Sequence, residues 1–69
     1  MSFIEVLDLK HMKKTYVNIN NINCIYTNFN KFNNGTMIEF TNNELIHTYE
    51  NITDLIKRIK ETKIEETIM

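Results

Sequence analysis

Cys24 and His47 are the two residues whose types suit nucleophilic catalysis, because a cysteine thiol becomes a nucleophilic thiolate once a neighbouring base removes its proton. The residues on either side of Cys24 are Asn23 and Ile25, and neither carries a positive charge that would lower the pKa of the thiol. The sequence therefore predicts a structural, partly buried thiol at Cys24 and a surface strand position for His47. We expect no catalytic residue and a protein that is not an enzyme.

Metal sites need grouped cysteine, histidine or acidic residues, and many phosphate-bearing cofactors need a glycine-rich loop. This chain has one cysteine, and its two histidines, His11 and His47, show no metal-ligand spacing. Gly35 is the only glycine, which excludes a glycine-rich phosphate loop. The acidic residues of the strand-like segments are scattered singly, with no pair spaced for acid–base work. We expect no metal site and no cofactor.

Aromatic and aliphatic side chains are the stronger candidates, because protein interfaces are enriched in aromatic residues. A chain of 69 residues with one cysteine has no internal disulfide and buries only a small core, so self-association would stabilise it. We therefore expect a protein partner and a homo-oligomer, with a dimer favoured. The predicted contact residues are Tyr16, Tyr26, Phe32, Tyr49, Ile64 and Ile68.

A second interpretation uses lysines in the predicted loops, because a sheet with exposed aromatics and a basic rim can bind single-stranded nucleic acid by stacking. These lysines are Lys10, Lys13, Lys14 and Lys31. The formal net charge of −1 argues against a dedicated nucleic-acid binder, since such proteins normally carry a basic excess. Protein binding is the favoured interpretation, and nucleic-acid binding stays open as the alternative.

The residues before Asn51 belong to short runs in which apolar and polar side chains alternate with period two, which predicts strands. The runs cover residues 3–9, 15–19, 22–29, 36–41 and 44–49. The positions predicted to face inward include Val17, Ile19, Ile38 and Phe40. The first run is apolar on both faces, so we expect it to be covered on both sides or to lie at an interface.

Short polar segments predict turns between these strands. Asn34-Gly35 predicts a hairpin turn, because both residues tolerate the positive φ that a type I′ turn requires. Asn42-Asn43 predicts a second compact turn. Since short turns join neighbouring strands, the strands should form a meander.

At Asn51 the apolar spacing changes from period two to helical. Asn51 is a predicted N-cap, and Ile52, Leu55, Ile56 and Ile59 form the apolar stripe of a helix. The helical phase breaks after Ile59. We therefore expect one compact domain over residues 1–60, and a tail at 61–69 that either frays or binds a partner. The predicted fold class is α+β, an antiparallel four- or five-stranded meander sheet with one C-terminal amphipathic helix packed on a face.

Composition suggests an origin and a location. Isoleucine and asparagine each occur eleven times and lysine seven times, while alanine, glutamine, proline and tryptophan are absent. These frequent residues have A/T-rich codons, which suggests an AT-rich genome or a phage or mobile element living in one. Together with the small size, this favours an inhibitor of a larger host protein machine.

With no apolar run near the ~20 residues of a membrane span and no signal-peptide pattern, we expect a cytoplasmic protein without membrane contact.

The run YVNINNINCI at residues 16–25, followed by TMIEF at 36–40 and the segment 45–50 before a short helix, resembles small bacterial regulatory domains. The nearest is the FlbD/SwrD type of flagellar and swarming-motility protein, and the LytTR DNA-binding domain is more distant. The resemblance covers residues 3–59 and implies a sheet with a C-terminal helix and a motility accessory role. The chain departs from that family at residues 10–14 and at Asn42-Asn43, where the family usually has Asn-Gly.

Overall fold

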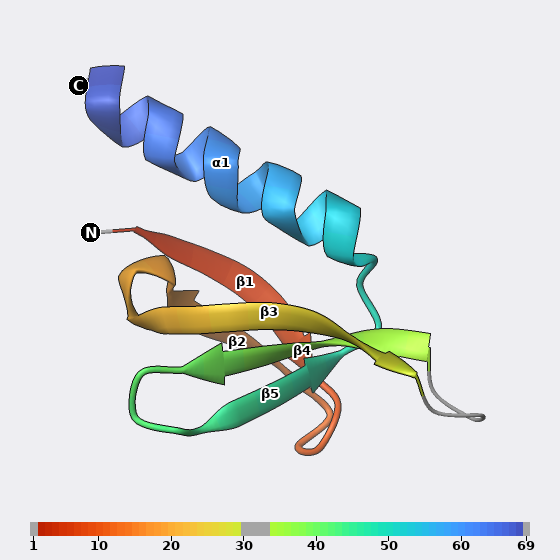
Figure 1. Cartoon of the computed structure of the whole chain (residues 1–69). Helices are drawn as coiled ribbons and strands as arrows, with labels where there is room; N and C mark the ends of the chain where they lie inside the picture. The colour runs from red at the N-terminus through yellow and green to blue at the C-terminus, as the bar shows by residue number, and fades with distance from the viewer. Residues whose placement is uncertain (1, 30–33, 69) are drawn as a thin grey trace.

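Five strands precede one C-terminal helix in the computed structural model, which describes residues 2–29 and 34–68 (Figure 1). The elements are β1 (Phe3–Asp8), β2 (Lys13–Asn18), the short 3₁₀-helix η1 (Ile19–Asn21), β3 (Ile22–Phe29), β4 (Asn34–Phe40), β5 (Leu45–Thr48) and α1 (Ile52–Ile68). All strand pairs are antiparallel. The predicted α+β class, with antiparallel strands and a C-terminal helix, is confirmed.

The strands form two sheets, a hairpin of β1 and β2 and a meander of β3, β4 and β5. The strand series predicted as one meander is therefore divided after β2. The cause is local, because the side-chain oxygen of Asn18 accepts a hydrogen bond from the N–H of Asn20 at 3.0 Å, which starts η1 and redirects the chain. The two sheets also meet where the N–H of Leu9 donates to the carbonyl of His47.

The core draws on both sheets and on the helix. Its buried members are Ile4, Val6, Val17, Ile19, Ile38, Phe40 and Leu55. The predicted inward positions Val17, Ile19, Ile38 and Phe40 are thus confirmed as buried. Because these side chains come from both sheets, the inner faces of the sheets pack together, and α1 lies over β1 and β3 (Figure 1).

The helix begins where the sequence predicts. The side-chain oxygen of Asn51 accepts a hydrogen bond from the N–H of Thr53 at 2.8 Å, as an N-cap does. Leu55 has no exposed surface, whereas Ile56 of the same predicted stripe is 37% exposed. The buried face is therefore narrower than predicted. The helical backbone continues to Ile68, so it includes most of the segment expected to be a tail.

The two predicted turns have different outcomes. Asn43 has φ of 70° and its N–H donates to the carbonyl of Phe40, which confirms the compact turn between β4 and β5. The hairpin predicted around Asn34-Gly35 is present, because β3 pairs antiparallel with β4. Asn34 and Gly35 themselves belong to β4, however, and Gly35 does not have the positive φ of a type I′ turn. Gly35 instead permits a close approach, since a Cβ atom there would lie 2.5 Å from the carbonyl oxygen of Thr48.

A buried carboxylate organises the loop between β1 and β2. Asp8 is only 7% exposed, and one of its oxygens accepts a hydrogen bond from the N–H of Lys10 at 3.1 Å. The other oxygen lies 2.7 Å from Nδ1 of His11. The hydrogen bond with His11 is the main cause that holds the pKa of Asp8 below its ordinary value. The ionised form of Asp8 therefore stabilises the loop.

We expect the stability of the chain to fall on acidification. Because the pKa of Asp8 is lower in the folded chain, its contribution is complete above its unfolded pKa and is lost as the pH falls through the folded value. The urea midpoint should decrease between about pH 5 and about pH 3, and less so in Asp8→Asn. Glu61→Gln, which alters an exposed carboxylate, is the control. An equal decrease in wild type and Asp8→Asn would contradict the assigned role.

Candidate functional site

The outward face of the β3–β5 sheet gathers exposed aromatic side chains. The strand register places Tyr26 opposite Met37, and Met37 opposite His47. The ring of Tyr49 meets that of His47 edge-on, with 6.2 Å between ring centroids. Tyr26 is 43% exposed and Tyr49 is 59% exposed. We name this surface the aromatic face, and it comprises Cys24, Tyr26, Met37, Glu39, Leu45, His47 and Tyr49.

His47 belongs to β5, in agreement with its predicted strand position, and packing fixes its side chain. A Cβ atom on Gly35 would lie 2.6 Å from Nε2 of His47, so the imidazole occupies the space that the glycine leaves. Nε2 is buried and has no hydrogen-bond partner among the described residues. The side chain is half-buried, and its ring packs at a steep angle against the ring of Tyr49.

Cys24 is exposed, so the partly buried thiol predicted from the sequence is wrong. The register of β3 against β4 is irregular between Ile22 and Cys24. Two residues, instead of one, therefore separate the inward-facing Ile22 from the inward-facing Ile25, and Cys24 faces outward. Its thiol donates to Oε2 of Glu39 at 2.9 Å, and this bond raises the pKa of Cys24. Cys24 and His47 lie on strands separated by β4, so they do not form a nucleophile–base pair.

Tyr16 lies on a different surface from Tyr26 and Tyr49. It is 68% exposed on the outer face of the β1–β2 hairpin, together with Phe3 and Leu7. Its hydroxyl donates to Glu5 at 3.1 Å. Because the inner faces of the two sheets pack together, their outer faces point in different directions. The predicted aromatic contact residues therefore do not form one cluster.

The remaining predicted residues are dispersed. Lys14 forms an ion pair with Glu5 at 3.4 Å, while Lys10 and Lys13 are exposed around the β1–β2 loop. Lys31 and Phe32 lie outside the described residues. Ile64 and Ile68 belong to the helical backbone of α1, and their side chains lie outside the described part of the structure. Lys10, Lys13 and Lys14 thus gather at the loop end of the hairpin and not on the aromatic face.

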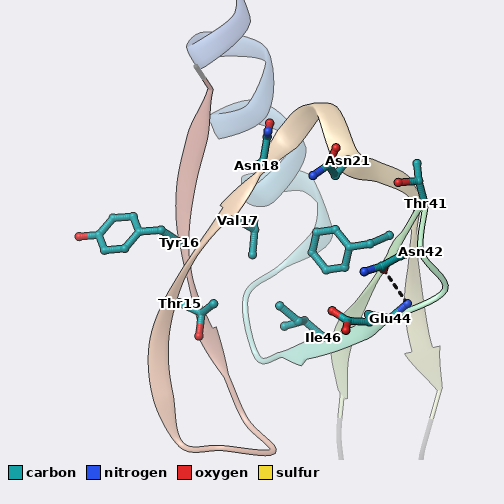
Figure 2. Close-up of a pocket in the computed structure, with 10 residues that line it drawn as sticks. Thr15, Tyr16, Val17, Asn18, Asn21, Thr41, Asn42, Glu44 and Ile46 are labelled. Atoms are coloured by element: carbon teal, nitrogen blue, oxygen red, sulfur yellow. Dashed lines mark hydrogen bonds between the residues drawn. The ribbon is translucent and has the colours of Figure 1, made fainter.

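A pocket of about 350 Å³ lies between β2 and the turn that joins β4 to β5 (Figure 2). Apolar side chains of Val17, Phe40 and Ile46 line it together with polar groups that include Asn18 and Glu44. No pattern in the sequence indicates this pocket. The local signals were a strand and an Asn-Asn turn, and only the folded chain brings these two segments together.

Three further findings concern metal ligands, membrane spans and known proteins. Within the described ranges, no three potential metal ligands are grouped closely enough to hold an ion. The part of the helix that the structure describes is not long and apolar enough to cross a membrane. No family model matches the chain, and no curated protein and no solved structure matches it either.

Proposed function

We propose that this chain is a small non-catalytic binding module that contacts another protein through the aromatic face. The observation that carries the proposal is the strand register, which aligns Tyr26, Met37 and His47 across three strands and leaves Tyr26 exposed. The carboxylate of this face, Glu39, is already hydrogen-bonded to Cys24. A surface that is aromatic and poor in free charge resembles the central part of a protein interface.

The partner that best fits this surface is a second copy of the chain. The core is small, so covering Tyr26, Leu45 and Tyr49 in a dimer would add apolar burial that the monomer lacks. For the biological role, we propose that the chain binds and regulates a larger host protein assembly, as a phage-type inhibitor does. That wider role rests on small size and AT-rich composition, whereas a motility accessory role rests on the sequence resemblance alone.

Sedimentation equilibrium over a range of concentrations tests the contact surface. We expect the wild type to dimerise, and Tyr26→Ala combined with Tyr49→Ala to weaken the dimer roughly thirtyfold or more, because buried aromatic side chains dominate interface energies. Tyr16→Ala is the matched control, since it removes the same side chain from the hairpin and should leave the dimer intact.

Two results of this experiment would contradict the proposal. A wild type that stays monomeric at the highest concentration would remove self-association. A double variant that dimerises as the wild type does would remove the aromatic face as the contact surface. The nucleic-acid alternative draws on the bond between Leu9 and His47, which places the basic loop beside β5. Sedimentation of the protein with a labelled single-stranded oligonucleotide at low salt tests this alternative, since co-sedimentation of the two would favour it.

A further inference from the structure

One edge of β2 is free in the described part of the chain. The N–H of Ile19 donates to the carbonyl of Ser2 at 2.9 Å, which sets the phase of the β1–β2 ladder. Because hydrogen-bonded and non-hydrogen-bonded pairs alternate, the backbone groups of Lys14, Tyr16 and Asn18 point away from β1. Within residues 2–29 and 34–68, β2 pairs with β1 alone. Unpaired edge groups of this kind are a template for another strand.

The pocket runs along this free edge. It is lined by four consecutive residues of β2, from Thr15 to Asn18. Figure 2 shows the side chain of Tyr16 pointing away from the pocket, so its backbone is the part that faces inward. The opposite wall is the β4–β5 turn, and Val17, Phe40 and Ile46 provide the apolar lining. The result is a groove with a hydrogen-bonding edge on one side and an apolar floor.

We propose that this groove binds an extended peptide segment of a partner protein, which adds as a strand to the free edge of β2. An extended backbone is the ligand whose donors and acceptors match those of an open strand edge, and alternate side chains then enter the neighbouring pocket. The volume of about 350 Å³ is small for a pocket, so it accommodates one or two apolar side chains. The proposal concerns a surface separate from the aromatic face.

The charge of the groove defines the peptide further. Glu44 stands exposed on the turn wall, and its side chain has no ion pair among the described residues. Its backbone N–H donates to the side-chain oxygen of Asn42 at 3.0 Å, which holds the turn in shape. A lysine or arginine next to the apolar residue of the peptide would meet this carboxylate. The expected ligand therefore combines alternate apolar residues with one basic residue.

Proline substitutions on β2 test strand addition directly. Asn18 has φ of −79°, which suits proline, and its N–H belongs to the free edge, so Asn18→Pro removes one donor without breaking the β1–β2 ladder. Asn18→Ala is the matched control, because it also loses the side chain but keeps the N–H. Tyr16→Pro with its control Tyr16→Ala is a second, independent pair should one proline variant not fold.

The probe is a yeast-displayed library of short random peptides, selected on the immobilised full chain and followed by fluorescence anisotropy with the enriched sequences. We expect enriched peptides to alternate apolar residues and to carry a lysine or arginine. Asn18→Pro should weaken their binding about tenfold relative to Asn18→Ala, as expected for one lost hydrogen bond. Glu44→Gln should weaken binding and reduce its dependence on salt.

Three outcomes would overturn the proposal. The first is that no sequence is enriched, and the second is that enriched peptides bind the proline and alanine variants equally well. The third is that the wild type forms a dimer, that the Asn18→Pro variant is monomeric, and that the variant with both Tyr26→Ala and Tyr49→Ala still dimerises. In that case the edge of β2 would be occupied by a second copy of the chain. Failure of the aromatic-face dimer alone leaves the peptide measurement unaffected, so the two proposals are separable.

Discussion

Replacement of Leu55 by alanine is expected to lower the free energy of unfolding by about 2–5 kcal/mol, which is a large part of the stability of a chain this small. Leu55 has no exposed surface and is the buried-core residue of α1 among the side chains that the structure describes. Its truncation would leave a cavity where the helix meets both sheets. Urea denaturation followed by circular dichroism measures the loss.

The control for this experiment is the neighbouring residue. Ile56→Ala removes an aliphatic side chain from the same helix, but Ile56 is 37% exposed and lies outside the buried core. We expect it to cost less than about 1 kcal/mol. Equal losses in the two variants would mean that α1 is not anchored through Leu55. The docking of α1 would then depend on Arg58, which donates to the side chain of Glu50 and the carbonyl of Glu5.

Local patterns were sufficient to predict the elements of the fold. Val17 and Ile38 are identified as inward-facing by the alternation of apolar and polar residues. This alternation can be recognised from neighbouring residues alone, because successive side chains of a strand point to opposite faces. The helix start at Asn51 is equally local, since the cap binds a backbone group two residues away. These features need no knowledge of the rest of the chain.

The features that were not predicted depend on an irregular local element or on contacts between distant segments. The division into two sheets follows from η1, and it places Tyr16 on one outer face and Tyr26 on another. Cys24 faces outward because the register of β3 against β4 is irregular, and the spacing of apolar residues does not show which residue is extra. The free edge of β2 and its pocket likewise exist only once the β4–β5 turn lies opposite that strand.

Gly35→Ala is expected to destabilise the chain by about 1–3 kcal/mol, the usual cost of overfilling a packed site. At a permissive position the same change would stabilise a protein by about 0.4–1 kcal/mol, because alanine restricts the unfolded chain. Here the new Cβ atom would lie 2.5 Å from the carbonyl oxygen of Thr48 and 2.6 Å from Nε2 of His47. The first contact is with backbone and cannot be relieved by a side-chain rotation. Urea denaturation of the single variant measures the net effect.

A second variant separates the two contacts of Gly35. Adding His47→Ala to Gly35→Ala removes the contact with the imidazole but keeps the contact with the carbonyl of Thr48. We therefore expect the double variant to lose less free energy of unfolding than the sum of the losses in the two single variants. The two substitutions should therefore be non-additive. Strict additivity, or a Gly35→Ala variant more stable than wild type, would contradict this close packing. Because His47 supports Tyr49, Gly35→Ala should also weaken self-association through the aromatic face, which makes Gly35 a positioning residue for the proposed interface.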